Sequence, residues 1–243
     1  RVRPHRIVAN GGGAIAGVDH DGDGDFDIAT STFAAISSCS YSNVMSIYVY
    51  GSPVTSSSPV TTITADYTLG SALSGGDVTG DGYEDLVVGI PCSNGYTSSG
   101  AVFLYTGPLV AGSWSYTSNV QALFMSGTSN DFLGSDAAAL PDANGDGIGD
   151  IAMGAPYADT TESTTGQVYV FFGPMDDYSG TVNAAAADIV WSGADGGDAI
   201  GQALDSAGDV DGDGLSDVVI GSYGYNGGGT DRGAAWLLTD LTA

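Results

Sequence analysis

The stretch Asp209–Asp217 has the sequence DVDGDGLSD and runs directly into the aliphatic segment VVIG at positions 218–221. Carboxylates stand at positions 1, 3, 5 and 9 of this loop, and Gly214 at position 6 permits the sharp turn that lets them converge. Such an oxygen set, with a backbone carbonyl added at position 7, suits a hard cation such as calcium. The stretch therefore predicts a calcium loop that leads into a buried strand.

Three more loops with the same spacing precede it, and repetition of this kind turns a weak motif into a strong one. Fourteen of the sixteen residues at positions 1, 3, 5 and 9 of the four loops are Asp, and these side chains would repel one another without a cation. We therefore expect about four calcium ions. The predicted ligands are Asp19, Asp21, Asp23 and Asp27; Asp77, Thr79, Asp81 and Asp85; Asp142, Asn144, Asp146 and Asp150; and Asp209, Asp211, Asp213 and Asp217.

Two other interpretations of the loops compete with this one. An EF-hand would require Glu at position 12 and a helix on each side, but position 12 holds Thr30, Val88, Met153 or Ile220. A set of Asp- and Gly-rich turns that bind nothing is the simpler alternative, since both residues are ordinary in turns. The shared register of so many carboxylates favours metal binding.

The residues around the loops resemble the FG-GAP repeats of integrin α-subunit propellers and of bacterial secreted propellers. A matching glycine precedes three loops, at Gly70, Gly134 and Gly201, and the literal sequence GAP follows one of them at 154–156. GIP at 89–91 is a close variant and GSY at 221–223 a looser one, and the first repeat departs most, with TST at 30–32. The resemblance covers nearly the whole chain. It implies a β-propeller with calcium between the first and second strand of each blade, and it implies no single activity.

The composition agrees with an all-β fold. Glycine accounts for 39 of the 243 residues, and Lys is absent, so good helix formers are scarce. We expect one domain, 1–243, forming a β-propeller of four four-stranded blades with repeats near 11–66, 67–130, 131–196 and 197–243. The predicted strands are 14–18, 28–32, 44–50 and 60–65; 71–76, 86–90, 101–105 and 120–125; 135–140, 151–155, 167–172 and 188–191; and 202–207, 218–221 and 234–238.

The two ends of the chain complement each other in this scheme. The last blade lacks its fourth strand, whereas residues 5–9 form a predicted strand without a blade of its own. An exposed strand edge is a template for pairing. Residues 5–9 can complete the last blade in cis, which we favour, or in trans to build a head-to-tail polymer. Residues 184–187 are expected as a surface segment, with a single helical turn as the alternative.

A net charge of −25 excludes some partners and leaves −17 after four calcium ions bind. Nucleic-acid surfaces need clustered Lys and Arg, so no nucleic-acid partner is expected. No run of about 18 apolar residues is present to insert into a membrane. Arg1 begins directly on polar sequence, so we expect that a secretion signal was removed or lies outside these residues, and that the protein is extracellular or at the cell surface.

Cys39 and Cys92 are the two cysteines of the chain. Both follow the second predicted strand of a blade, in corresponding loops of neighbouring blades, so the two thiols can approach each other. Two free thiols are the alternative. In a secreted calcium-dependent fold we favour a disulfide, because oxidising compartments allow it.

The sequence offers little for an enzyme, and we expect none. His5 lies in the terminal arm, and His20 occupies a loop position that is expected to point to solvent. Neither a nucleophile elbow nor an HExxH motif nor a phosphate-binding GxxxxGK loop occurs. The carboxylates that follow the repeat are better assigned to metal than to acid–base catalysis.

Function is therefore expected at the loops opposite the calcium sites, 33–43, 92–100, 157–166 and 223–233. These loops vary in length and carry aromatic residues among Ser, Gly and Asn, a composition that suits adaptable recognition. We expect a binding or adhesion module with a protein or glycan ligand. A self-assembling filament or surface-layer subunit that exchanges strands, and a carbohydrate-binding lectin, are the alternatives.

Overall fold

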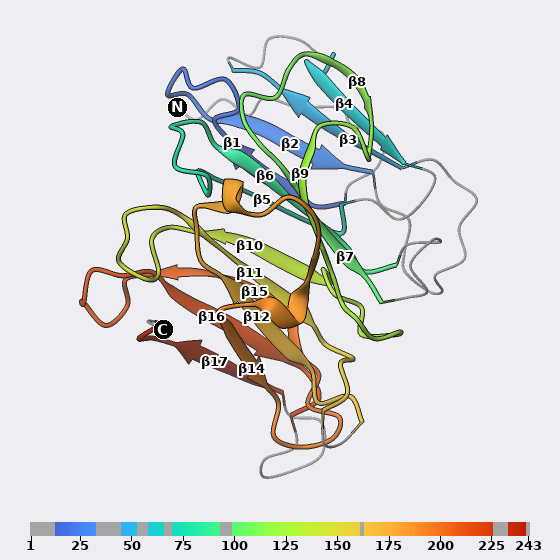
Figure 1. Cartoon of the computed structure of the whole chain (residues 1–243), viewed down its shortest axis with the longest axis vertical. Helices are drawn as coiled ribbons and strands as arrows, with labels where there is room; N and C mark the ends of the chain where they lie inside the picture. Colours follow the sequence, from blue (N-terminus) through green and yellow to red (C-terminus); the bar gives the residue numbers. More distant parts are fainter. Residues whose placement is uncertain are drawn as a thin grey trace, which may run out of the picture.

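The computed structural model describes residues 13–32, 45–52, 58–65, 70–92, 99–160, 163–225 and 233–241. Its regular structure consists almost entirely of β-strands, arranged in four sheets that follow one another along the chain (Figure 1). Within these residues no helix is both long and apolar enough to cross a membrane. The expected all-β fold is confirmed.

Sheets 1 and 2 each consist of a four-stranded antiparallel meander with one parallel strand added at the outer edge. Sheet 1 has the order β1 (Ile15–Val18), β2 (Asp27–Ser31), β3 (Met45–Tyr50), β4 (Thr61–Ala65) and β8 (Gly112–Ser115). Sheet 2 has the order β5 (Ala72–Gly76), β6 (Asp85–Ile90), β7 (Ala101–Tyr105), β9 (Val120–Met125) and β13 (Gly180–Asn183).

Sheets 3 and 4 are meanders without an added strand in the described part of the chain. Sheet 3 has the order β10 (Asp136–Leu140), β11 (Asp150–Ala155), β12 (Gln167–Phe171) and β14 (Ile189–Ser192). Sheet 4 has the order β15 (Ile200–Gly208), β16 (Asp217–Ser222) and β17 (Ala234–Leu238).

All fifteen strands expected from the sequence are present, and no boundary differs by more than two residues. The sequence reading missed β8 and β13. Both are four residues long and lie in the connection between the third and fourth strands of one repeat, yet they pair with the sheet of the preceding repeat. Neighbouring sheets are thereby tied together by main-chain hydrogen bonds. Sheets 1 and 2 have five strands rather than the expected four.

One further expectation about a connection was wrong. Residues Ala184–Ala186 form a 3-10 turn (η2) instead of an irregular surface segment, and a second turn, η1, spans Met175–Asp177. The side chain of Asn183 accepts a hydrogen bond from the Ala185 backbone and caps η2, while Ala184 is fully buried. A capping Asn and one buried apolar contact therefore order this segment.

The sheets pack face to face, so alternate residues of one strand enter different cores. In β6, Val87 joins the core between sheets 2 and 3, whereas Leu86 and Val88 join the core between sheets 1 and 2. A third core lies between sheets 3 and 4. Because both faces of sheets 2 and 3 are covered, all residues of β6 and β11 are buried. The aromatic residues of the third strands, such as Phe103 and Phe171, lie in these cores.

The inner strands β1, β5, β10 and β15 stack in that order, and among the described residues β15 has no comparable packing against β1. Figure 1 shows sheet 1 and sheet 4 at opposite ends of the molecule. The fold is propeller-like, and the described residues form an arc without a closed ring. The predicted strand 5–9 lies outside the described residues, so completion of the last blade stays a prediction.

The disulfide prediction is confirmed at Cys92, which is disulfide-bonded. Cys39, the only other cysteine of the chain, lies outside the described residues. Cys92 is buried and lies two residues after the end of β6. It is therefore at the end of the sheet where the loop between the second and third strands begins.

Candidate metal centres in the four acidic loops

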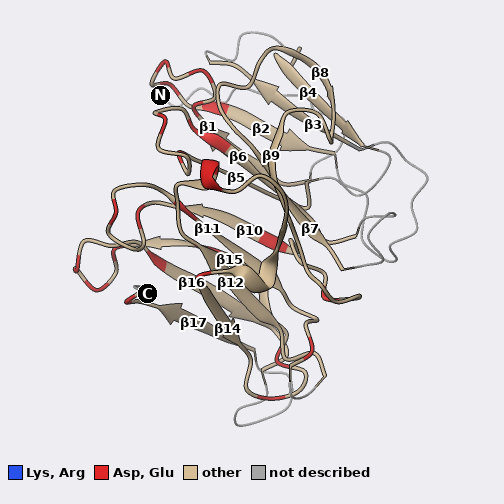
Figure 2. Cartoon of the chain, in the orientation of Figure 1, with Lys and Arg blue, Asp and Glu red and all other residues tan. Residues whose placement is uncertain are grey.

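The four acidic loops occupy equivalent places in the four sheets. Residues 19–27, 77–85, 142–150 and 209–217 each connect the first strand of a sheet to its second. We call them loops 1 to 4. Figure 2 shows acidic residues gathered along the edge where these loops lie. All four Arg residues fall outside the described part of the chain, so no positive side chain stands beside these carboxylates there.

One hydrogen-bond pattern shapes all four loops. The carboxylate at position 1 accepts hydrogen bonds from the backbone N–H groups at positions 4 and 6, at 2.8 and 2.9 Å from Asp19 to Gly22 and Gly24. The corresponding distances are 2.7 and 3.0 Å in loop 2, 2.5 and 2.9 Å in loop 3, and 2.6 and 3.0 Å in loop 4. The first repeat, which departs most in its flanking sequence, therefore has the same loop geometry as the others.

Position 4 is a glycine in every loop, a signal that the sequence contains and that we missed. Its φ is +76° at Gly22, +77° at Gly80, +89° at Gly145 and +86° at Gly212. The glycine at position 6 has a positive φ as well, for example +93° at Gly214. L-residues with a side chain rarely adopt this conformation. Two left-handed glycines, rather than one, fold each loop back over its first carboxylate.

Loops 1 and 4 each bring three of their predicted carboxylate ligands together. In loop 1 oxygens of Asp19, Asp21 and Asp23 lie within 4.8 Å of one another, and in loop 4 the same holds for Asp209, Asp211 and Asp217. Loops 2 and 3 have Thr79 and Asn144 at position 3, and among the described residues neither of these loops forms such a group of three carboxylates. The Asn144 amide accepts from the Asp146 backbone at 2.9 Å and donates to the Asp146 carboxylate at 2.9 Å. These donor sets consist of oxygens and fit a hard divalent cation such as calcium.

The aspartate at position 9 has a second role that the sequence reading missed. Asp85 is fully buried; one of its oxygens accepts from the N–H groups of Val78 and Thr79, and the other accepts from Gly107 after β7. Asp150 does the same with Ala143 and Gly173. In loops 2 and 3 position 9 thus fastens the loop to the end of the third strand.

Burial governs the protonation of these two carboxyl groups. It raises the pKa of Asp85 and of Asp150 to about 6, although the hydrogen bonds from backbone N–H groups oppose this change. A carboxylate has about four lone-pair positions, so these hydrogen bonds leave room for a cation. A bound cation would favour the charged form that burial disfavours.

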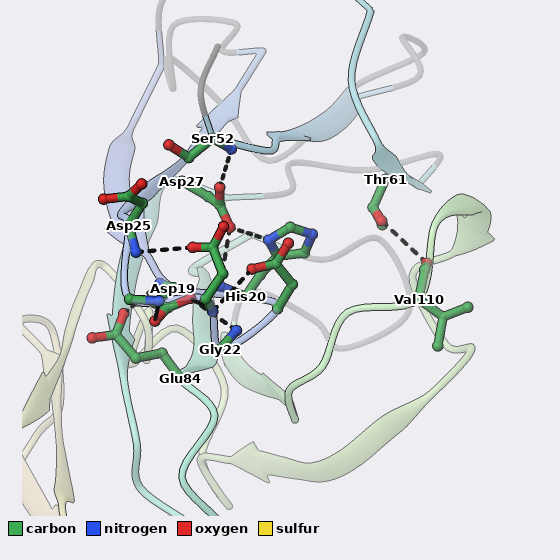
Figure 3. Close-up of polar contacts among 12 residues, drawn as sticks. Asp19, His20, Gly22, Asp25, Asp27, Ser52, Thr61, Glu84 and Val110 are labelled. Atoms are coloured by element: carbon green, nitrogen blue, oxygen red, sulfur yellow. Dashed lines mark hydrogen bonds and ion pairs between the residues drawn. The ribbon is translucent and has the colours of Figure 1, made fainter.

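His20 does not point to solvent, contrary to expectation. Its side chain is buried, and its Nδ1 contacts the carboxylate of Asp27, which also accepts the His20 backbone N–H at 3.2 Å (Figure 3). The second Asp27 oxygen accepts the N–H of Ser52. Position 2 faces the protein interior, as Val78 and Ala143 do in loops 2 and 3. The imidazole is tolerated there because Asp27 is its hydrogen-bond partner.

Neighbouring loops are linked by their main chains. The N–H at position 8 of one loop donates to the carbonyl at position 1 of the preceding loop: from Glu84 to Asp19 at 3.3 Å, from Gly149 to Asp77 at 3.2 Å and from Ser216 to Asp142 at 2.8 Å. The Glu84 carboxylate also accepts the Asp19 N–H at 2.8 Å (Figure 3). A cation that fixes one loop therefore supports the next.

The residue at position 7 covers the position-4 glycine of the preceding loop. A Cβ added at Gly22 would lie 2.7 Å from the Tyr83 ring, and a Cβ at Gly80 would lie 3.3 Å from Ile148. Leu215 stands in the same relation to Gly145, at 3.4 Å. Side-chain packing, as well as backbone hydrogen bonds, therefore joins each loop to the next one along the arc.

Asp240, which follows β17, is a further acidic neighbour that the sequence reading missed. Its carboxylate lies within 4.8 Å of oxygens of Asp211 and Asp213. In sheets 2 and 3 the corresponding positions are Gly107 and Gly173, so no repeat pattern points to it. Loop 4 consequently has two groups of three carboxylates, which share Asp211.

An aromatic cluster lies at the opposite ends of the strands from the acidic loops. Tyr157 follows β11 and Tyr223 follows β16, and their hydroxyl groups are 3.4 Å apart. The Tyr157 ring packs on Phe132 with ring centres 5.1 Å apart. The hydrogen bond with Tyr157 raises the pKa of Tyr223 to about 12. We call Phe132, Tyr157 and Tyr223 the aromatic cluster.

Only part of the predicted recognition surface can be compared with the structure. Phe33, Tyr41 and Tyr96 lie outside the described residues. Tyr225 packs edge-on against Trp236, with ring centres 5.3 Å apart, so it contributes to sheet 4 itself. Tyr157 and Tyr223 are exposed, and 55% of the Tyr223 surface is accessible to solvent.

Comparison with known proteins finds related repeats in this chain. Residues 69–105, 133–171 and 201–238 match the FG-GAP family, described as FG-GAP repeat. Over 165 residues the chain is 32% identical to integrin alpha-IIb from Homo sapiens, covering 65% of this chain and 15% of the integrin. Integrin alpha-PS2 from Drosophila melanogaster is 33% identical over 164 residues, covering 64% of this chain and 11% of that protein.

The name of a third relative is that of an enzyme. Phosphatidylinositol-glycan-specific phospholipase D from Bos taurus is 33% identical over 177 residues, covering 68% of this chain and 20% of the phospholipase. The chain therefore spans no more than a fifth of the length of these three relatives. The similarity concerns the repeat region that all of them share.

Proposed function

The chain is an FG-GAP repeat protein related to integrin alpha subunits, and from this premise we propose that it is a calcium-stabilised extracellular binding or adhesion module. Calcium holds the four acidic loops in place, and the loops at the opposite ends of the strands bind a partner. The region has no catalytic role of its own. The phospholipase relative shares only this repeat region, so its printed activity is not transferred to the chain.

The observation that carries the metal assignment is the common geometry of the four loops. Each folds its first carboxylate under two left-handed glycines and presents further oxygens beside it. In the described part of the chain no Lys or Arg offsets the resulting negative charge. Calcium accepts six to eight oxygen ligands, a number that loop carboxylates, the position-7 carbonyl and water can supply together.

An extracellular location follows from the affinity expected of such loops. Extracellular calcium modules bind with Kd values of about 0.1–1 mM, which is much weaker than the roughly 0.1–10 μM of cytosolic calcium sensors. The disulfide at Cys92 agrees with an oxidising compartment. Both arguments support a secreted or surface-exposed protein.

The aromatic cluster supports recognition at the face opposite the acidic loops. Exposed tyrosines supply rigid contact area and a hydrogen-bonding hydroxyl with little loss of side-chain entropy, so they are common in binding surfaces. Tyr157 and Tyr223 come from neighbouring sheets, and their mutual hydrogen bond holds both rings in place. Protein and glycan ligands both suit such a surface.

Calorimetric titration of metal-free protein with calcium tests the first half of the proposal. We expect calcium binding that Asp213→Ala weakens; no heat of binding and no change in melting temperature would disprove it. The second half is tested with beads coated with the chain. The measurement is their retention on immobilised matrix proteins and on a glycan array. Tyr157→Ala should reduce retention, whereas Phe26→Ala, which removes an exposed aromatic side chain within loop 1 at the opposite ends of the strands, should not.

A further inference from the structure

Loop 3 differs from the other three loops in having a side-chain amide at position 3, directly before the position-4 glycine. The two residues are Asn144 and Gly145, whereas position 3 is Asp21, Thr79 or Asp211 in loops 1, 2 and 4. An Asn side chain that precedes glycine can be attacked by the backbone nitrogen that follows it, because glycine has no Cβ to obstruct the approach. Asn144 is half-buried and Gly145 is exposed, so water reaches the pair.

The reaction that this pair permits is deamidation. The Gly145 nitrogen forms a bond to Cγ of Asn144, the bond from Cγ to the side-chain nitrogen breaks, and the Gly145 proton leaves with that nitrogen as ammonia. The product is a cyclic imide, a succinimide. Water then opens one of the two ring bonds between nitrogen and carbonyl carbon and returns a proton to the Gly145 nitrogen. The protein loses one ammonia, gains one water and acquires a negative charge in the loop.

In the folded loop three hydrogen bonds oppose this attack. The Gly145 N–H donates to the Asp142 carboxylate at 2.5 Å. The Asn144 side chain accepts the Asp146 N–H at 2.9 Å and donates to the Asp146 carboxylate at 2.9 Å. The Leu215 side chain of loop 4 covers Gly145, 3.4 Å from the place of an added Cβ. The Asn144 amide must leave Asp146 before it can react, and the Gly145 nitrogen must leave Asp142, so loop 3 has to open.

The carboxylates that restrain the pair are also predicted cation ligands. Asp142 and Asp146 stand at positions 1 and 5 of loop 3, and Asp150 stands at position 9. No Lys or Arg offsets their charge in the described part of the chain. Without a cation these carboxylates repel one another and favour the open loop, whereas a cation draws them together around Asn144. Protection of the amide and binding of the cation therefore depend on the same side chains.

We propose that Asn144 is a deamidation site under the control of calcium: the reaction is blocked while loop 3 is loaded and proceeds when the cation is removed. The control by calcium rests on the metal assignment proposed above, whereas the reactivity of the pair does not. Because opening of the loop precedes the attack, the rate follows the fraction of molecules in which loop 3 is open. A ligand at ten times its Kd lowers the unloaded fraction about tenfold.

The two products change loop 3 in opposite directions. Opening of the ring at the side-chain carbonyl leaves an aspartate at position 144, and loop 3 then has four carboxylates, as loops 1 and 4 do. Opening at the main-chain carbonyl leaves an isoaspartate, which lengthens the main chain by one carbon atom and moves the glycine N–H groups at positions 4 and 6 away from Asp142. The first product should bind calcium more tightly than the unmodified loop, and the second more weakly. Each period without calcium thus alters loop 3 permanently.

Peptide mass spectrometry of the full chain, sampled over time in calcium and in excess chelator at one pH, tests the proposal. Deamidation at Asn144 should be about tenfold slower in calcium at ten times its Kd. Digestion with pepsin in acid limits further deamidation, and fragmentation distinguishes aspartate from isoaspartate. The chain has three other Asn-Gly pairs, at 10–11, 94–95 and 226–227, all outside the acidic loops. Their rates are the internal control for a change that affects the whole chain.

Variants in saturating calcium distinguish an effect at loop 3 from an effect on the whole chain. Asp146→Ala removes a ligand and the partner of the Asn144 amide, so it should speed deamidation at Asn144 about tenfold. Asp176→Ala removes an exposed carboxylate outside the loops and is the matched control. Thr79→Asn gives loop 2 the same Asn-Gly pair and should transfer the calcium-controlled reaction to loop 2. Circular dichroism confirms that the variants fold.

Equal rates at Asn144 in calcium and in chelator, including no reaction in either, would overturn the proposal, as would a wild-type rate in Asp146→Ala. Titration calorimetry of the same samples identifies which premise failed. Calcium binding together with equal deamidation rates would overturn the control by calcium and leave the metal assignment intact. Absence of calcium binding would overturn both.

Discussion

Sheets 2 and 3 have neighbours on both faces, whereas sheets 1 and 4 have a neighbour on one face only, and the same sequence pattern behaves differently in the two settings. Leu104 on β7 and Leu237 on β17 occupy the same register position, yet Leu104 is fully buried and Leu237 is 45% exposed. The loops differ in the same way. Loop 2 is hydrogen-bonded to both neighbouring loops, whereas loops 1 and 4 are each bonded to one in the described part of the chain. Burial is therefore a property of the stack and not of the single repeat.

Removal of calcium should have the largest effect. With Kd values near ~0.1–1 mM and a tenfold excess of calcium, each site stabilises the folded chain by about 1.4 kcal/mol, and four sites give roughly 5–6 kcal/mol. That is comparable to the whole stability of a domain. Excess chelator should lower the melting temperature by many degrees in differential scanning calorimetry. An unchanged transition would contradict the metal assignment in all four loops.

Truncation of the two equivalent leucines tests the comparison directly. Leu104→Ala leaves a cavity in the core between sheets 2 and 3 and should lower the free energy of unfolding by ~2–5 kcal/mol. Leu237→Ala removes a half-exposed side chain and should cost less than ~1 kcal/mol. Urea unfolding of dilute protein in calcium measures both. Equal losses would mean that sheet 4 is covered as completely as sheet 2 within one molecule.

A smaller contrast is expected at the position-4 glycines. Gly22→Ala and Gly212→Ala both force a side chain into a positive φ, at a cost of ~1–2 kcal/mol each. Only the first also meets a neighbour, the ring of Tyr83 at 2.7 Å from the added Cβ. Gly22→Ala should therefore cost about 1 kcal/mol more. In a Tyr83→Ala background this excess should disappear, and its persistence would show that loop packing is not its origin.

The sequence predicted strands and loops well because both signals are local. Aliphatic runs that begin after position 9 of each loop place the second strand, and the repeat then fixes the others. The features that the sequence did not predict, such as β8 and the position of Asp240, depend on contacts between repeats. The strand β8 is formed by GSWS, which has no pattern of its own, and it exists because the edge of β4 accepts it. Asp240 joins loop 4 through the path of the chain after β17, which no spacing rule encodes.

The assignment of position 9 shows a different limit. Spacing alone gave Asp85 a single role as a ligand, because the sequence does not show that its oxygens meet the backbone at Val78 and after β7. His20 was misplaced for the same reason, since its partner Asp27 becomes visible only when the loop closes. For Asp85 and for His20 the sequence shows which polar residue is in the loop, but it does not show in which direction the side chain points.

The smallest expected difference concerns the affinities of the loops. Loops 1 and 4 offer four carboxylates at the predicted ligand positions, whereas Thr79 and Asn144 reduce loops 2 and 3 to three. Ligand charge tunes calcium affinity, so Asp23→Ala and Asp213→Ala should each remove a tighter site, and Asp81→Ala and Asp146→Ala a weaker one. Calorimetric titration of the four variants gives the order, and the reverse order would contradict the charge argument.

Two substitutions distinguish the effect of ligand charge on calcium affinity from the effect of a loop's position in the arc. Thr79→Asp and Asn144→Asp give loops 2 and 3 the carboxylate count of the end loops without moving them from their place between two neighbours. If charge decides the order, each variant should tighten its own site severalfold in the same titration. If the inner loops stay weak, the difference arises from the hydrogen bonds that hold them to neighbouring loops, because a loop fixed on both sides adapts less readily to the cation. Either result assigns the difference between inner and end loops to a named cause.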